Sequence, residues 1–207
     1  RPKGAIVHNS AKTTTGAVSF MDLYSMTTGL IGQRGRRGAL MISIDVNHPD
    51  IEEFIDVKTD LEKVTKANIS VRINDEFMRA VLTKSMYECK FIVESDGEVI
   101  IKQVDAHKLF MKLIANNWDF AEPGILFWDN IENNHLLSED TTFKYAGVNP
   151  CAEEPLPAGG SCLLGSINLS EFVIAPFTNH AIFDKAKFKS CVRDCVVGLN
   201  EVLEEGL

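Results

Sequence analysis

Short apolar runs alternate with amphipathic helical patterns over most of the chain, and this alternation constrains the fold more than any other feature. Strand-like runs span 39–45, 68–73 and 124–129, and helical patterns span 17–30, 48–57, 75–82, 104–117 and 184–205. Asp96-Gly97 lies between two further short runs, 91–95 and 98–101, which predicts one antiparallel hairpin. Strands separated by helices usually pair in parallel. We therefore expect an α/β fold with largely parallel strands, without internal repeats or an interdomain linker.

The composition excludes several classes of protein. The 207 residues are 45% hydrophobic and 24% charged, an average composition for a globular protein. A net charge of −8 argues against general nucleic-acid or anionic-membrane binding. No apolar run approaches the ~20 residues of a membrane span, and no signal peptide opens the chain, so we expect a cytoplasmic protein. Because the chain begins at Arg1 rather than Met, we also expect a piece of a larger protein.

The cysteines do not form a recognisable metal framework. There are five of them, and their spacings match no set of paired C-x-x-C knuckles, so we expect free thiols and no metal site. Cys191 and Cys195 lie four residues apart on the apolar face of the last helical pattern. We expect these two to be buried structural thiols.

The stretch from Asn149 to Cys162 is the candidate active site. Three prolines and two glycines exclude a continuous helix or a central strand, so we expect a loop. Cys151 and Glu153 lie two residues apart and would point to the same side if the loop is extended. An amide, two thiols and a carboxylate favour nucleophilic catalysis or thiol redox chemistry, but a proline-rich surface loop with structural thiols explains the same spacing.

Residues 29–38 carry a glycine at every third position with three arginines between them. Bare backbone amides and guanidinium groups suit an anion such as a phosphate. A flexible surface turn with solvated charge is the alternative interpretation.

Several blocks of the chain together resemble the large, catalytic subunit of ribonucleotide reductases. Asn149-Pro150-Cys151-Ala152-Glu153, followed by the block 161–169, closely resembles the finger-loop segment of that subunit. Further blocks that resemble the family, in the family's order, are 16–21, 35–39, 48–55 and 68–71. The resemblance covers most of the chain.

The resemblance implies a fold. It is a ten-stranded α/β barrel with a central finger loop that carries the active-site cysteine, and residues 1–207 would form a single segment of it. Within this segment, residues 1–45 would hold the effector and specificity loops, and residues 147–169 would be the finger loop inside the barrel.

The resemblance also implies radical reduction of ribonucleotides to deoxyribonucleotides. Cys151 would carry the transient thiyl radical that takes the 3′ hydrogen of the ribose. Glu153 would act as the base for the 3′ hydroxyl, and Asn149 would hydrogen-bond the ribose hydroxyls. Cys162 would be one of two redox thiols, and its partner would lie upstream of Arg1.

The glycine and arginine segment would link an allosteric site, which binds a dNTP or ATP effector, to the substrate base. A loop around residues 3–15 would lie beside it. The residues assigned to this role are Gln33, Arg34, Gly35, Arg36, Arg37 and Gly38, of which Arg36 and Arg37 are the strongest candidates.

The resemblance further implies a ribonucleoside-diphosphate reductase that uses thioredoxin or glutaredoxin and is a homodimer at full length. The eleven-residue spacing from Cys151 to Cys162 looks like the adenosylcobalamin-dependent branch, although forms with a metal-bearing, radical-generating small subunit also fit. No cobalamin-binding motif is present, and we expect residues 1–207 alone to be inactive. Two alternatives remain: a nucleotide-binding regulatory module with inert cysteines, and a cysteine hydrolase.

Overall fold

The protein is described by a computed structural model that covers residues 1–31 and 38–206. These residues form two compact units, Arg1–Ala158 and Gly159–Leu207. None of the described helices is both long enough and apolar enough to cross a membrane.

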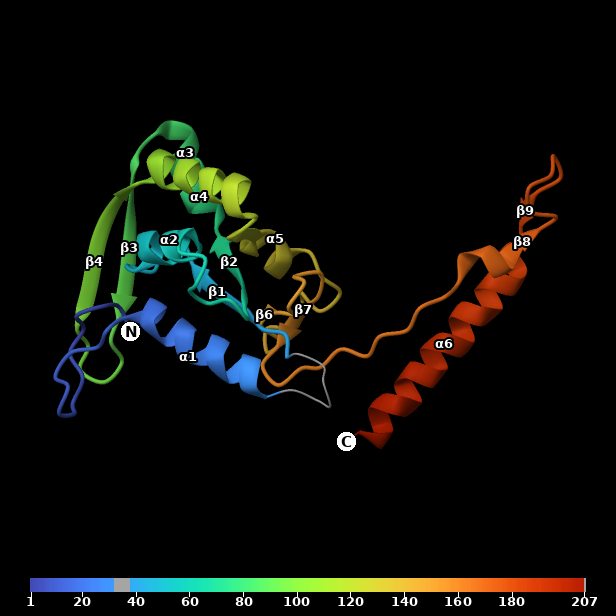
Figure 1. The fold of residues 1–207 in the computed structure, drawn as a ribbon, viewed down its shortest axis with the longest axis horizontal. Helices are drawn as coiled ribbons and strands as arrows, with labels where there is room; N and C mark the ends of the chain where they lie inside the picture. The colour runs from blue at the N-terminus through green and yellow to red at the C-terminus, as the bar shows by residue number, and fades with distance from the viewer. Residues whose placement is uncertain (32–37, 207) are drawn as a thin grey trace. The chain divides into compact units, whose positions relative to one another are not determined.

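A three-stranded parallel sheet forms the centre of the first unit (Figure 1). The strands β1 (Met41–Asp45), β2 (Asn68–Ile73) and β5 (Gly124–Phe127) lie in the order β1-β2-β5, and both pairings are parallel. The predicted strands and their parallel pairing are therefore confirmed.

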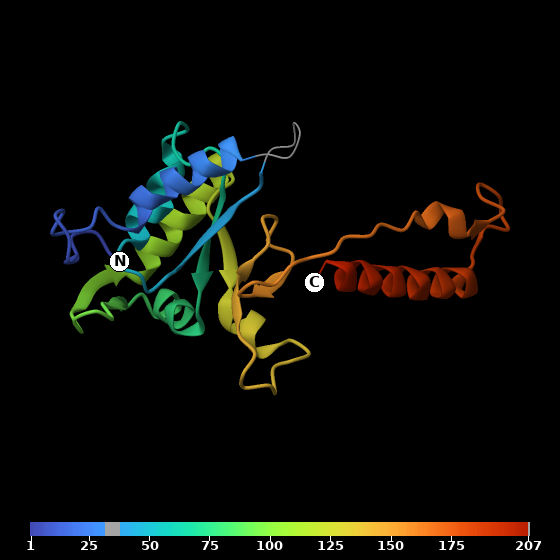
Figure 2. The ribbon, with the colours of Figure 1, turned by 90° about the horizontal axis from the view of Figure 1, so that it is seen from below.

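Four helices of the first unit cover one face of this sheet. They are α1 (Ala17–Leu30), α2 (Ile51–Asp56) with the 3-10 turn η1 (Val57–Thr59), α3 (Asp75–Thr83) and α4 (Ala106–Phe120). A fifth, short helix, α5 (Trp128–Asn133), follows β5 directly and contributes no residue to the hydrophobic core of the described chain. Figure 2 shows α1, α2 and α4 together on one side of the sheet. The β2 side chains of Ile69, Val71 and Ile73 are buried in the same core as apolar residues of α1 to α4. Burial of alternate β2 residues against this layer is what holds the helices to the sheet.

The hairpin of β3 (Met86–Ile92) and β4 (Val99–Asp105) is longer than the predicted runs 91–95 and 98–101. Tyr87 and Cys89 point into the core from β3 while their neighbours are exposed, which is the alternation of a half-buried strand. Because Asp105 still pairs with β3, helix α4 begins after it, and the Asp105 carboxylate caps the helix by accepting from the Lys108 amide.

A second hairpin corrects the prediction of a continuous loop over 149–162. Strand β6 (Tyr145–Val148) pairs antiparallel with β7 (Pro155–Pro157), so only the residues between them form a turn. The prolines fit because this two-stranded ladder consists of edges alone, where the missing amide hydrogen is tolerated.

The second unit contains η2 (Leu169–Phe172), β8 (Val173–Ile174), β9 (Ile182–Phe183) and α6 (Lys185–Glu205). Asp184 caps α6 by accepting from the Lys187 amide. The prediction that Cys191 and Cys195 are buried is wrong: both are partly exposed, and no described residue of α6 is buried. Within this unit η2 packs on the helix, and too little else does so to enclose its apolar face.

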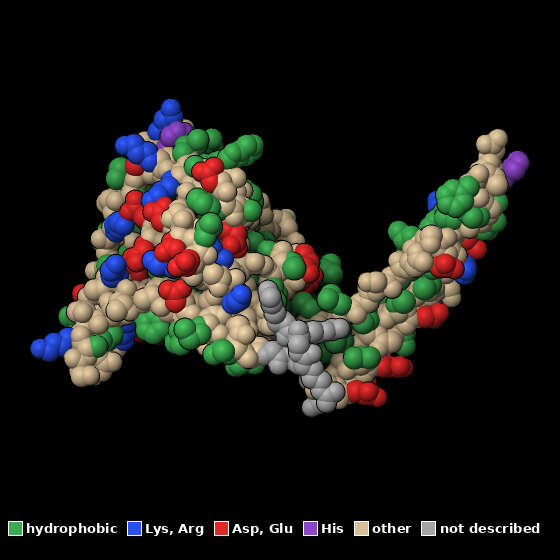
Figure 3. Space-filling view, viewed as in Figure 1, with side chains coloured by type: hydrophobic (Ala, Val, Ile, Leu, Met, Phe, Trp, Pro, Cys, Tyr) green, Lys and Arg blue, Asp and Glu red, His purple; other side chains and the backbone are tan. Residues whose placement is uncertain are grey.

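The described residues do not form a closed barrel. They form the parallel sheet and three separate antiparallel pairs, so the ten-stranded barrel stays a prediction. The position of a finger loop inside a barrel stays a prediction. On the face of the first unit shown in Figure 3, acidic and basic side chains are interspersed rather than gathered into a basic patch.

Candidate active site

Asn149 is the first residue of the turn between β6 and β7, and its hydrogen bonds hold the turn together. The Asn149 amide donates to the Glu154 carbonyl (3.1 Å), and the Asn149 carbonyl accepts from the Ala152 amide (2.9 Å). The side-chain Oδ1 of Asn149 accepts from the Glu154 amide (3.0 Å). Oδ1 thus helps to shape the turn, and Nδ2, which makes no hydrogen bond to the residues that the structure describes, is a donor available to a ligand.

The turn exposes two reactive side chains, Cys151 and Glu153. The loop is not extended between them, because Ala152 has a φ of 68°, in the left-handed region, so the condition under which both side chains would point to the same side is not met. A non-glycine residue in this region is uncommon and strained. Asn149, Cys151 and Glu153 therefore lie on one tight turn rather than on an extended strand. Cys162 is also exposed and belongs to the second unit.

The sheet face opposite the helices carries polar residues that the sequence interpretation missed. Side chains alternate along β2, so Asn68, Ser70 and Arg72 point away from the helical core. The Asn68 side-chain amide donates to the Pro150 carbonyl of the turn at 2.7 Å. The signal in the sequence was the polar residue at every second position of an otherwise apolar strand.

Arg72 is held on the same face by several groups. Its Nη2 donates to Asp45 Oδ2 of β1 at 2.7 Å, and the guanidinium lies 4.7 Å from the centre of the Trp128 ring. Its Nη1 lies 3.4 Å from the Ala146 carbonyl of β6, a long contact. Its Nε is buried and has no hydrogen-bond partner among the described residues. The Arg72 guanidinium is thus paired with Asp45 and stacked on Trp128, and it contacts the β6–β7 hairpin from the sheet side.

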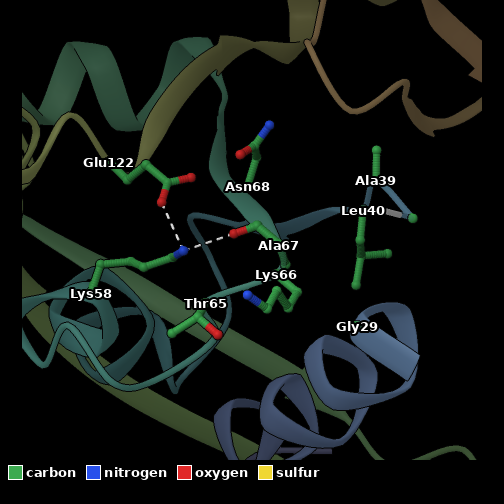
Figure 4. Close-up of a pocket in the computed structure, with 10 residues that line it drawn as sticks. Gly29, Ala39, Leu40, Lys58, Thr65, Lys66, Ala67, Asn68 and Glu122 are labelled. Atoms are coloured by element: carbon green, nitrogen blue, oxygen red, sulfur yellow. Dashed lines mark hydrogen bonds and ion pairs between the residues drawn. The ribbon is translucent and has the colours of Figure 1, made fainter. Parts of the chain in front are cut away.

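A cavity of about 560 Å³ lies at the amino ends of β1 and β2 (Figure 4). Its lining residues are Gly29, Gly38, Ala39, Leu40, Lys58, Thr65, Lys66, Ala67, Asn68 and Glu122. Lys58 Nζ forms an ion pair with Glu122 Oε2 at 2.9 Å and donates to the Val64 and Ala67 carbonyls at 2.8 and 2.7 Å. The Lys58 ammonium group is therefore already satisfied by the protein.

The predicted effector-loop residues Gln33, Arg34, Gly35, Arg36 and Arg37 lie outside the described residues. Gly38, the last of the set, is exposed and borders the cavity. A Cβ at this position would lie 2.9 Å from the Thr28 carbonyl oxygen, so the close approach of these two segments requires glycine.

The neighbouring segment at the chain start is anchored by Asp50. Its carboxylate oxygens accept from the Lys3 amide at 3.0 and 3.1 Å, and Oδ2 accepts from the Ala17 amide at 2.9 Å. Gly16, with a φ of 98°, has no side chain with which to cap α1, so Asp50 satisfies the helix start from a distance.

The remaining thiol in the first unit is part of the core. Cys89 is fully buried, and its Sγ lies 3.6 Å from the Val46 carbonyl oxygen. Burial raises the pKa of Cys89 from 9.0 to about 11, so the thiol stays protonated and inert. Across residues 1–31 and 38–206, no group of three His, Cys, Asp or Glu side chains is placed to hold a metal ion.

Comparisons with known proteins agree with the resemblance. The family model described as "Ribonucleotide reductase, barrel domain" matches residues 1–206. A vitamin B12-dependent ribonucleoside-diphosphate reductase of Thermoplasma acidophilum is 37% identical over 84% of this chain and 22% of its own length. A vitamin B12-dependent ribonucleotide reductase of Streptomyces clavuligerus is 34% identical over 93% of this chain and 22% of its own length. A vitamin B12-dependent ribonucleoside-diphosphate reductase of Mycobacterium tuberculosis is 34% identical over 84% of this chain and 25% of its own length. The chain thus spans a quarter or less of these relatives.

Proposed function

Because the chain belongs to the ribonucleotide reductase family, as a segment of the large-subunit barrel domain, we propose that the whole protein reduces ribonucleotides to deoxyribonucleotides by radical chemistry. The names of the relatives favour this function over a nucleotide-binding regulatory module or a cysteine hydrolase. Two of these names also favour a ribonucleoside diphosphate as the substrate. We propose the cytoplasm as the place of the reaction.

The observation that supports the proposal is that Cys151 and Glu153 are both exposed on one short turn, which Asn149 closes. A thiyl radical on Cys151 would take the hydrogen atom from the 3′ carbon of the ribose, forming an S–H bond. Glu153 would accept the proton of the 3′ hydroxyl, while the 2′ hydroxyl takes up a proton and leaves as water. Asn149 would use its free Nδ2 to orient the ribose hydroxyls.

Two further thiols would complete the reduction. Cys162 and a cysteine outside these residues would together give two electrons and two protons and close into a disulfide, after which the Cys151 hydrogen returns to the 3′ carbon. The balance is one ribonucleotide and two thiols converted to one deoxyribonucleotide, one disulfide and water. Thioredoxin or glutaredoxin would reopen the disulfide. Without the second redox thiol, residues 1–207 alone would not turn over.

Adenosylcobalamin is the cofactor that the relatives' names favour, and it would supply the radical that reaches Cys151. Among the described residues, the exposed Cys151 thiol could accept the radical, and the cofactor itself would be bound by another part of the protein. An ATP or dNTP effector would act through residues 1–45, including Arg36 and Arg37, in a homodimer of the full protein.

The test is a reductase assay on the full-length protein with ribonucleoside diphosphates, a dithiol reductant and added adenosylcobalamin. We expect Cys151→Ala, Glu153→Ala and Cys162→Ala each to lower turnover by at least about a thousandfold, because each removes a group from the reaction itself. Cys195→Ala is the matched control, since this thiol is partly exposed and has no role in the scheme.

Melting temperatures of the variants would show that folding is intact. Turnover of the Cys151→Ala variant near the wild-type rate would refute radical reduction at this turn. Turnover that needs a separate metal-bearing subunit instead of the cofactor would refute only the cobalamin assignment.

A further inference from the structure

The hydrogen bonds within the turn at 149–154 fix its shape but not its place on the sheet. Among the residues that the structure describes, the three bonds of Asn149 close on the turn itself. Within the described part of the chain, two side-chain hydrogen bonds run from β2 to this hairpin: Asn68 to the Pro150 carbonyl, at 2.7 Å, and Arg72 to the Ala146 carbonyl of β6, at 3.4 Å. Only the first of these lies within the ordinary range for an N–H···O bond.

The acceptor of that bond is the carbonyl of the peptide that joins Pro150 to Cys151. A peptide unit is planar, so fixing its oxygen also fixes the direction of the Cys151 amide nitrogen and constrains the Cys151 Cα position. Asn68 therefore acts on the backbone immediately before the thiol, from a strand that lies 82 residues earlier in the chain.

The donor itself sits on rigid structure. Asn68 is the first residue of β2, its own amide donates to the Leu40 carbonyl at 2.8 Å, and it is paired in register with Met41 of β1. The next residue, Ile69, is fully buried. Figure 4 shows the Asn68 side chain at the rim of the cavity with its amide directed away from Lys58. An exposed side chain fixed at its backbone on both sides is well suited to hold a neighbouring turn.

We propose that Asn68 is a positioning residue that sets where Cys151 lies relative to the parallel sheet. This inference rests on the proposed function, because hydrogen-atom transfer needs the sulfur and the ribose carbon in contact. A displacement of about 1 Å between reacting groups can lower a rate by about a hundredfold. Asn68 itself touches neither the substrate nor the reacting atoms in this scheme.

The test compares variants of the full-length protein. Asn68→Asp keeps the size of the side chain but replaces the donor with an oxygen that repels the Pro150 carbonyl, and Asn68→Ala removes the group. We expect kcat to fall by about 10- to 100-fold in both, with KM within about twofold of wild type. Asn68→Gln keeps the donor, and it should recover most of kcat. Asn117→Asp is the matched control, because the Asn117 side-chain amide also donates to a proline carbonyl, that of Pro123, at 2.9 Å.

Amide hydrogen exchange gives a readout that does not depend on activity. In Asn68→Asp we expect faster exchange in peptides that cover 149–154 and unchanged exchange in β1. A kcat for Asn68→Asp within twofold of wild type, unchanged exchange in 149–154, or an equal loss in Asn117→Asp would overturn the proposal. A wild-type protein that makes no deoxyribonucleotide would instead refute the proposed function, and the exchange result would still decide whether Asn68 holds the turn.

Discussion

The ion pair in the cavity wall offers a sharp test of the packing around β2. Lys58→Met keeps most of the apolar stem of the side chain but removes an ammonium group with three acceptors: Glu122 Oε2, the Val64 carbonyl and the Ala67 carbonyl. The side chains of Lys58 and Glu122 are only 14% and 23% exposed. The variant therefore leaves a largely buried carboxylate and two carbonyls without their partner.

The loss of stability expected for Lys58→Met follows from these lost interactions. Breaking a buried pair by removing one partner costs about 3–5 kcal/mol, because the other charge stays buried. The residual exposure of both groups favours the lower end, about 3 kcal/mol. Since 1.4 kcal/mol is a factor of ten, amides protected by this region should exchange about a hundredfold faster.

The assay is amide hydrogen exchange of the full-length protein over residues 67–69. Here the Ile69 amide donates to Glu122 Oε1 at 2.9 Å. The double variant Lys58→Met/Glu122→Gln should lose less protection than Lys58→Met, because glutamine keeps the oxygen for Ile69 and carries no charge. Lys63→Met is the control, since its pair with Asp60 is 3.8 Å long and more than half exposed on both sides. Such surface pairs contribute about 0–1 kcal/mol.

An increase in exchange of less than about threefold in Lys58→Met would refute the reasoning, because it would put the cost below about 0.7 kcal/mol. A double variant as labile as the single one would refute the specific claim that the unpaired charge causes the loss.

Two further predictions concern the anchoring of the chain start and the buried thiol. Asp50→Ala should speed amide exchange at the start of α1 by about 10- to 100-fold, because hydrogen bonds to a charged group contribute about 1.5–3 kcal/mol. Asp60→Ala, at an exposed carboxylate, is the control and should leave this exchange unchanged. Equal exchange in both variants would contradict the capping role of Asp50. The raised pKa of Cys89 means that the unfolded chain ionises first, so stability should be full below pH 9.0 and fall by about 3 kcal/mol as pH rises to about 11. In urea unfolding, the difference between wild type and Cys89→Ala should shrink over this pH range, and a constant difference would contradict the assigned pKa.

Local patterns in the sequence predicted strands and helices well where the buried apolar residues recur at a regular spacing. Strand β2 was predicted at its observed bounds, and α1 likewise, because each has a regular apolar pattern. The pairing of β6 with β7 was missed, since prolines weaken any strand signal and the pairing depends on a turn that Asn149 closes. The lengths of β3 and β4 were underestimated, because a half-buried strand continues through exposed residues that carry no apolar signal.

The sequence identified only those candidate site residues that lie within one short segment. Asn149, Cys151 and Glu153 are neighbours in sequence, so a motif identifies them. Asn68 was missed because its contact with Pro150 depends on how two distant strands are placed, which no local pattern encodes. The burial of Cys191 and Cys195 was wrongly predicted, since an apolar helix face shows that a partner is needed and does not show that the described chain supplies it.

Strand β2 packs against the helices on one face and contacts the β6–β7 hairpin on the other, and this limits the insertions and deletions that the gene can accept. Its odd-numbered residues fill the helical core, and the side chains of Asn68 and Arg72 reach the β6–β7 hairpin from the other face. Insertion or deletion of a single codon within 68–73 would exchange the two sets, placing Arg72 against the helices and isoleucine under the turn. Loops such as 93–98 can absorb changes in length, but this strand can accept only substitutions.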